Sequence, residues 1–133
     1  MINNKERYSW FQFEEDIAKI AAWATDKKFK SIYGIPRGGL VPAVKISNIL
    51  EIPLILHCGD ITPSTLVVDD IIDNGKTLKR FLRSVDVNCC VASIFLNKSS
   101  SIKPDFFVRQ KKKKQWIVFP WETDESSRYD GTV

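Results

Sequence analysis

The chain has 133 residues, of which 44% are hydrophobic and 27% charged, and its formal net charge is +4. This length predicts one domain with a real core, and the composition is ordinary for a soluble globular protein. No stretch approaches the roughly 18 apolar residues of a membrane span, the first residues contain no signal-peptide core, and the modest positive charge favours small polyanionic partners without arguing for nucleic acid.

The cysteine and histidine content points to an intracellular setting. Of three cysteines, Cys89 and Cys90 are adjacent within an apolar run, which indicates buried reduced thiols and no disulfide set. His57 is the only histidine, so a His-rich zinc site is excluded. We therefore expect a cytoplasmic protein.

The first predicted element is a helix over residues 8–24. Apolar residues recur there at spacings of three and four, and Ser9 is suited to be its N-cap. We expect this helix to pack on a sheet, with Trp23 in the core or at an interface.

A strand over residues 29–35 then leads through Pro36-Arg37-Gly38-Gly39 into a helical pattern over residues 40–50. Two consecutive glycines let the backbone approach a bound group closely, and Arg37 adds a fixed positive charge suited to phosphate. A tight turn without a ligand would also explain this pattern.

Residues 51–57 predict a further strand that starts near Pro53, a position where proline is tolerated. Only residues 58–64 separate this strand from the next one, so the connection between them is short.

The most informative stretch runs from residue 65 to residue 77. Thr65-Leu-Val-Val68 predicts a strand buried on both faces, and Asp69 and Asp70 stand where it should end. A polar turn then leads into a helix over residues 77–86; the turn consists of Asp73, Asn74, Gly75, Lys76 and Thr77.

Such an order of strand, loop and helix predicts a ligand site. Backbone N–H groups of a glycine-containing loop at a helix N-terminus bind anions, phosphate above all. The paired carboxylates Asp69 and Asp70 are suited to hold ribose hydroxyls directly or through Mg²⁺. Taken singly, each of these features is more typical of a solvated turn.

The remaining chain predicts two strands, over residues 88–96 and 103–109, the second at a sheet edge. Asn97 and Lys98 follow the first of them. The lysine run 111–114 is more typical of a solvated hairpin tip than of a polyanion site, and edge lysines discourage aggregation.

Three motifs resemble those of type I phosphoribosyltransferases, most closely the xanthine-guanine and hypoxanthine enzymes. The stretch 65–77 resembles their signature for phosphoribosyl pyrophosphate (PRPP), with Asn74 where the pattern usually has Thr. Residues 34–42 resemble their pyrophosphate loop, which binds through backbone amides and often contains a strained non-proline peptide bond; Pro36 stands where Ser is common. Residues 116–122, Trp-Ile-Val-Phe-Pro-Trp-Glu, resemble the base-binding stretch.

The resemblance implies a doubly wound parallel sheet flanked by helices, with the site across its carboxyl edge. It implies transfer of phosphoribosyl from PRPP to a 6-oxopurine in purine salvage, with release of pyrophosphate and with Mg²⁺ held near Asp69 and Asp70, through water. PRPP would bind to Arg37, Gly38, Gly39, Asp69, Asp70, Asp73, Asn74, Gly75, Lys76 and Thr77.

The same resemblance implies roles for the base-binding residues. Asp73 would be the catalytic general base or acid at the imidazole edge of the purine. Trp116 would stack on the base, and the backbone of Ile117 would read its edge. A family lysine that contacts the exocyclic oxygen aligns with Asn97, so either Lys98 takes this role through a shifted loop or Asn97 replaces the lysine.

The short interval 58–64 departs from the family, where a long mobile loop closes over the site and excludes water. An alternative hypothesis is therefore a PRPP- or nucleotide-binding regulator, or a catalytically impaired relative. A flavodoxin-like fold with fortuitous loops is a further option.

Residues 1–122 predict a single phosphoribosyltransferase domain, and residues 123–133 predict a polar, flexible tail. Relatives form dimers and tetramers, so we expect a homo-oligomer, with no nucleic acid and no membrane as partner. Trp10, Trp23 and the lysine run are candidates for its interfaces.

Overall fold

The computed structural model of the chain describes residues 5–112 and 114–123. Its centre is a parallel sheet in the order β2-β3-β4-β5, formed by β2 (Ser31–Gly34), β3 (Thr65–Ile72), β4 (Cys90–Asn97) and β5 (Phe106–Lys111). A second, two-stranded parallel sheet pairs β1 (Lys5–Arg7) with β6 (Trp116–Val118). The predicted tail, residues 123–133, lies outside the described part except for Thr123, so it stays a prediction.

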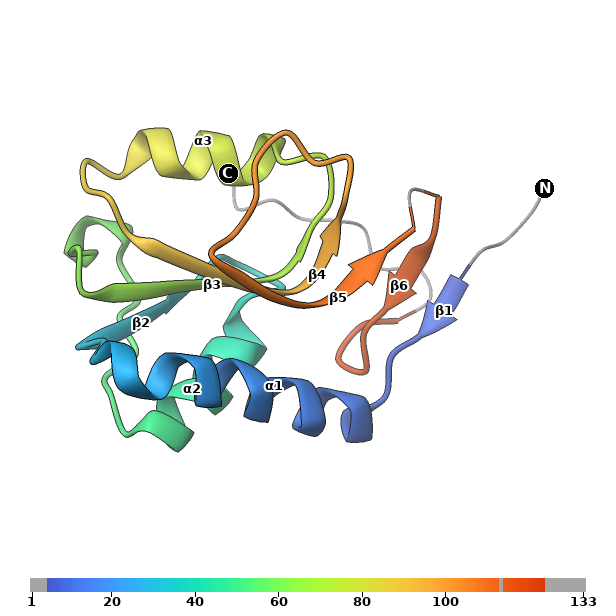
Figure 1. Cartoon of the computed structure of the whole chain (residues 1–133), viewed down its shortest axis with the longest axis horizontal. Helices are drawn as coiled ribbons and strands as arrows, with labels where there is room; N and C mark the ends of the chain where they lie inside the picture. Colours follow the sequence, from blue (N-terminus) through green and yellow to red (C-terminus); the bar gives the residue numbers. More distant parts are fainter. Residues whose placement is uncertain (1–4, 113, 124–133) are drawn as a thin grey trace.

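Helices cover both faces of the four-stranded sheet, which confirms the predicted fold class. Helices α1 (Trp10–Ala24) and α2 (Leu40–Leu50) lie on one face, and α3 (Lys76–Ser84) lies on the other (Figure 1). Two short 3-10 turns, η1 (Thr25–Lys27) and η2 (Cys58–Asp60), complete the elements. Each face has its own hydrophobic core, and the alternate side chains of β3 and β4 contribute to both.

The start of α1 follows from its local sequence. The Ser9 hydroxyl accepts a hydrogen bond from the Gln12 amide at 3.0 Å, and the Gln12 side chain accepts one from the Ser9 amide at 2.9 Å. This reciprocal capping box confirms the predicted N-cap. Trp23 near the other end stacks on Phe106 with 5.0 Å between ring centroids, so it packs against the core.

A buried ion pair attaches α1 to β5. Asp16 has no exposed surface and accepts hydrogen bonds from Arg109 Nε at 2.6 Å, from Arg109 Nη2 at 3.2 Å and from the Tyr8 hydroxyl at 2.5 Å. Burial, and then the hydrogen bond to Asp16, raise the pKa of Tyr8. The hydrogen bonds that Arg109 donates to Asp16 raise the pKa of Arg109. The periodicity of residues 8–24 did not reveal this charged group on the inner face of the helix.

Three predicted boundaries differ from the structure. The strand expected over residues 51–57 is reduced to a single bridge between Ile32 and Leu54, beside the edge strand β2. Strand β3 continues to Ile72, four residues beyond its predicted end, because its pairing with β4 continues to Leu96. Strand β5 begins at Phe106 and not at residue 103 as predicted, because Pro104 has no N–H to donate to the hydrogen bonds between strands.

The lysine run is the fourth difference. Lys111 was expected at a solvated hairpin tip, but it is the last residue of β5 and is buried. The cause is tertiary, because Lys111 is the register partner of Asn97, at the covered end of β4. The exposed Lys112 agrees with the prediction, and Lys113 lies outside the described residues.

Candidate active site

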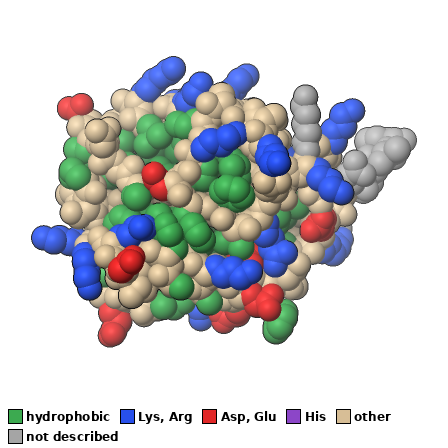
Figure 2. All heavy atoms as spheres, viewed as in Figure 1, with side chains coloured by type: hydrophobic (Ala, Val, Ile, Leu, Met, Phe, Trp, Pro, Cys, Tyr) green, Lys and Arg blue, Asp and Glu red, His purple; other side chains and the backbone are tan. Residues whose placement is uncertain are grey.

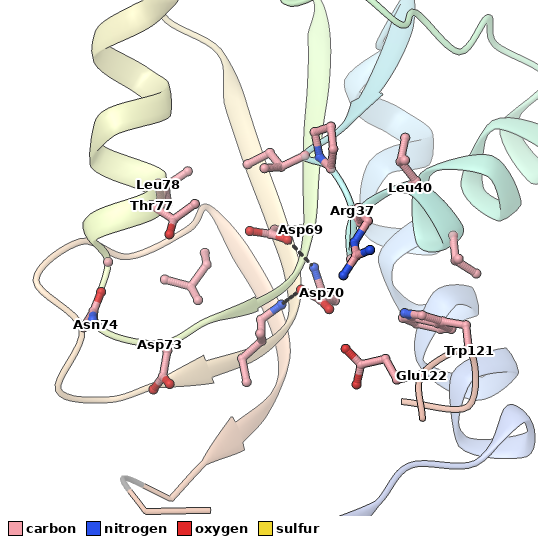
Figure 3. Close-up of a pocket in the computed structure, with 17 residues that line it drawn as sticks. Arg37, Leu40, Asp69, Asp70, Asp73, Asn74, Thr77, Leu78, Trp121 and Glu122 are labelled. Carbon is pink, nitrogen blue, oxygen red and sulfur yellow. Dashed lines mark hydrogen bonds between the residues drawn. The ribbon is translucent and has the colours of Figure 1, made fainter. Parts of the chain in front are cut away.

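A cavity of about 590 Å³ opens beside the carboxyl ends of β2 and β3. One wall comes from the loop and first turn after β2, and the other from the end of β3 and the loop that leads into α3. In Figure 3 the side chains of Asp69 and Asp70 lie between Arg37 on one side and Thr77 on the other. Ligand sites of open parallel sheets are expected at this edge.

Asp69 and Asp70 are both buried although both line the cavity. Because β3 extends beyond them, they lie within the strand and not at its end as predicted. Asp69 Oδ1 accepts a hydrogen bond from the Asp70 amide at 2.8 Å, and Asp70 Oδ1 accepts one from the Ile71 amide at 2.7 Å (Figure 3). These bonds fix both carboxylates against the strand.

The loop after β2 contacts the acidic pair directly. A Cβ atom on Gly38 would lie 2.1 Å from Asp70 Oδ2, so only glycine allows this approach. Arg37 and Gly38 line the cavity, and the peptide bond between Pro36 and Arg37 is cis. Gly39 is buried behind them, and its N–H donates to the Ile35 carbonyl at 2.8 Å, so it does not face the cavity.

The loop between β3 and α3 forms the other wall. Gly75 has φ of +90° and precedes α3, and a Cβ there would lie 2.7 Å from Ser100 Oγ. Asn74 Oδ1 accepts a hydrogen bond from the Lys76 amide at 2.8 Å, while the Asn74 carbonyl accepts from both the amide and the hydroxyl of Ser101. The loop is thus held from inside and from the β4–β5 connection, with its amides at a helix N-terminus.

Asp73 lines the cavity and receives two hydrogen bonds on one oxygen. Its Oδ1 accepts from Asn97 Nδ2 at 2.9 Å and from Lys111 Nζ at 3.1 Å. The side chain of Asp73 is 54% exposed, whereas that of Lys111 is only 5% exposed. A half-exposed carboxylate in a cavity is able to exchange a proton with a ligand.

The sequence-based predictions missed Trp121 and Glu122 as cavity residues, together with the apolar lining residues Ile35, Leu40, Val41, Ile71, Ile72 and Leu78. Trp121 and Glu122 line the side opposite the β3–α3 loop (Figure 3). The Phe119 amide donates to Glu122 Oε1 and the Glu122 amide donates to the Phe119 carbonyl, both at 3.0 Å, which forms a turn after β6. Trp121 stacks on Phe119 inside this turn, and its buried Nε1 has no hydrogen-bond partner among the described residues. Their signal was present, since both belong to the stretch that resembles the base-binding motif.

Comparisons with known proteins agree with this site. The chain is 31% identical, over an alignment 137 positions long, to the xanthine-guanine phosphoribosyltransferase of Desulfotalea psychrophila, covering 87% of this chain and 85% of that one. It belongs to the purine phosphoribosyltransferase family. No protein-family model matches the chain.

Solved structures of this family share the fold. A purine phosphoribosyltransferase from Pyrococcus horikoshii superposes with a TM-score of 0.80 at 29% identity, covering 96% of this chain and 99% of that one. The xanthine-guanine-hypoxanthine phosphoribosyltransferase of Helicobacter pylori gives a TM-score of 0.79 at 23% identity, with 90% and 95% of the two chains covered. The relatives are therefore matched over nearly their whole length.

The expected residues of the base-binding part do not line the cavity. Lys98 is exposed in the turn after β4, and its carbonyl accepts a hydrogen bond from Lys103 Nζ at 2.6 Å. Trp116 is 39% exposed in β6, and the side chain of Ile117 is wholly buried in the core. Asn97, the alternative to Lys98, directs its amide to Asp73, while its Oδ1 accepts from the amide and hydroxyl of Ser99.

The residues present fit a magnesium ion that is shared with a substrate. No group of three or more His, Cys, Asp and Glu side chains in the described ranges could hold a metal ion by itself. Mg²⁺ needs only one or two carboxylates when waters and substrate phosphates complete its shell. The buried pair Asp69 and Asp70, in an oxygen-rich cavity, supplies such carboxylates.

Residues 58–64 form a short connection to β3 in the structure. Only the 3-10 turn η2 (Cys58–Asp60) and a second turn at residues 63–64 separate residue 57 from β3, and residues 58–60 are exposed. No hairpin or long loop closes the cavity from this segment.

The helices and the surface charge bear on membrane and nucleic-acid partners. Across the described ranges, none of the helices has the length and apolar character needed to cross a membrane. Lys and Arg side chains are spread over the face shown in Figure 2 and are not gathered in a single basic patch.

Proposed function

We propose that this chain transfers a phosphoribosyl group from PRPP to a 6-oxopurine and releases pyrophosphate, in purine salvage. The observation that supports this best is one cavity lined by Arg37, by the acidic pair and by the loop before α3. Of that loop, Asp73, Asn74, Gly75 and Thr77 line the cavity, whereas Lys76 is exposed outside it. Relatives named for this activity match the chain over most of its length.

In the proposed complex, PRPP spans the cavity. The amides of the loop that begins at Asp73 hold its 5′-phosphate, with Thr77 at the first turn of α3. Asp69 and Asp70 hold the ribose hydroxyls and the water shell of Mg²⁺, which supplies positive charge against the pyrophosphate. Arg37 and the Gly38 backbone stabilise the charge that grows on the pyrophosphate as it leaves.

The chemical step forms a bond between a purine nitrogen and the ribose C1 while the bond from C1 to the pyrophosphate oxygen breaks. The purine loses the proton of its imidazole edge, and we assign this proton to the carboxylate of Asp73. We assign the base to the end of the cavity that Trp121 and Glu122 line. Trp116 and Ile117, the expected base-binding residues, belong to the same segment of the chain, and an indole offers a flat face for the base.

The alternative, a regulator that binds PRPP without turnover, was suggested by the short interval 58–64. The comparisons do not favour it, since the relatives that match the chain carry the names of enzymes. A homo-oligomeric state, dimer or tetramer, stays a prediction, to which the exposed Trp10 and Phe11 at the start of α1 give support.

Turnover of PRPP with a panel of purine and pyrimidine bases in the presence of Mg²⁺ tests the proposal. We expect nucleotide formation with a 6-oxopurine and a loss of about 10²–10⁴-fold in kcat for Asp73→Asn, as is typical when a general base is removed. Asp86→Asn, an exposed aspartate outside the cavity, is the charge-matched control and should keep full activity. Binding of PRPP without turnover of any base would overturn the catalytic proposal in favour of the regulator.

A further inference from the structure

Lys111 lies at an unusual place for a lysine. Its side chain is almost wholly buried at the end of β5, and its Nζ lies 3.1 Å from Asp73 Oδ1. The register partner of Lys111 on β4 is Asn97, whose Nδ2 lies 2.9 Å from the same oxygen. Two adjacent strands therefore direct one donor each to a single carboxylate oxygen.

The two oxygens of Asp73 consequently differ. Oδ1 has both donors, whereas Oδ2 makes no hydrogen bond within the described part of the chain. Asp73 lines the cavity and is half exposed, so its second oxygen can meet a ligand without breaking either anchor. Both donors meet an ionised acceptor, but only Lys111 also carries a full positive charge, so it adds an ion-pair attraction that the neutral amide of Asn97 lacks.

We propose that Lys111 is a positioning residue that orients the Asp73 carboxylate, with Asn97 as its neutral partner. This inference rests on the proposed function and adds a residue to it from a lysine run that the sequence assigned to solvent. Lys111 acts through Asp73 and does not itself contact the base. Misplacement of a reacting group by about 1 Å can cost on the order of 100-fold in rate, which sets the scale of the expected effect.

A cycle of variants tests the coupling. We expect Lys111→Met to lower kcat by on the order of 10- to 100-fold and to leave the dissociation constant of PRPP, measured without base, within about twofold. Lys111→Arg, which keeps the charge and can reach the same oxygen, should recover part of the loss. Lys112→Met, the exposed neighbouring lysine, is the matched control and should not change kcat.

The same substitution in the Asp73→Asn background is decisive. If Lys111 acts through Asp73, adding Lys111→Met to Asp73→Asn should cost less than about twofold further, since coupled residues are not additive. An equal loss in both backgrounds would overturn the inference, because Lys111 would then act on the base directly or on the fold.

A measurement without turnover keeps this inference separate from the proposed function. Acylation of individual lysines by an activated ester, followed by mass spectrometry, should label Lys111 several-fold faster in Asp73→Asn than in the wild-type chain, and Lys112 equally in both. Unchanged labelling of Lys111 would overturn the contact itself. If Lys111 is labelled slowly in the wild-type chain but no base is turned over, the contact between Lys111 and Asp73 stands. The proposed function is then overturned, and the catalytic role of Lys111 falls with it.

Discussion

Two carboxylates of this chain are each paired with a cation of β5 and with one neutral donor, in opposite surroundings. Asp16 has Arg109 and the Tyr8 hydroxyl as partners and is 0% exposed. Asp73 has Lys111, two residues further along the strand, and is 54% exposed. In the first pair the carboxylate is buried and the cation partly exposed, and in the second the arrangement is reversed.

This reversal separates a structural role from a catalytic one. Both oxygens of Asp16 accept hydrogen bonds, so nothing is left for a ligand, and the pair joins α1 to the sheet. Asp73 has only one anchored oxygen and lines the cavity. A buried charge without its partner costs several kcal/mol, whereas an exposed one is solvated, so the two clusters should respond differently to loss of the cation.

The largest effect is expected for Arg109→Met. This change leaves the Asp16 charge buried without a cation, and we expect the free energy of unfolding to fall by about 3–5 kcal/mol. Urea unfolding with a constant m-value measures it, and Arg83→Met, an exposed arginine of α3, should stay within about 0.5 kcal/mol of the wild type. A loss for Arg109→Met as small as that of the control would contradict the structural role of this pair.

The next effect is expected for Tyr8→Phe, which removes a hydrogen bond to a charged group at a cost of about 1.5–3 kcal/mol near neutral pH. Burial, and then Asp16, raise the pKa of Tyr8 above its usual value of 10.0, so the folded chain keeps the proton at pH values where the unfolded chain loses it. The stabilisation is therefore complete below pH 10 and is lost above it, by about 1.4 kcal/mol per pH unit.

Unfolding free energies of wild type and Tyr8→Phe, measured from pH 7 to pH 11, check this. The difference in unfolding free energy between the two proteins should be constant up to about pH 10 and should shrink above it, because only the wild type has the Tyr8 hydroxyl. The other tyrosines titrate in both proteins, so their contributions cancel. A difference that grows above pH 10 would mean that Tyr8 is not held in its protonated form.

The smallest effect is expected for Lys111→Met on stability. Asp73 remains in contact with water and keeps its hydrogen bond from Asn97, so the free energy of unfolding should change by at most about 1 kcal/mol. The same urea experiment as for Arg109→Met measures it. A loss as large as for Arg109→Met would mean that the two clusters do not differ as described, and that the effect of Lys111→Met on kcat reflects the fold.

Much of the fold followed from local patterns. The spacing of apolar residues and the Ser9 cap predicted α1, and the buried run that begins at Thr65 predicted the central strand. The loops around Arg37 and Asn74 were predicted as ligand loops because glycine, charged residues and a following helix occur together in sequence. Each of these signals depends on residues within a few positions of one another.

Local sequence was thus enough for the order of the three helices and of the four strands of the main sheet, and for the two loops that face the cavity, but not for β1, β6 or the loss of the strand expected over residues 51–57. The tertiary structure decided how far β3 extends, because its length is set by pairing with β4, and it buried Lys111, because a lysine run is solvated unless a distant residue supplies a partner. It also brought Trp121 and Glu122 to the cavity through the turn after β6. The contact between Asp73 and Lys111 joins positions 38 residues apart, and no local pattern of charge or hydrophobicity contains that information.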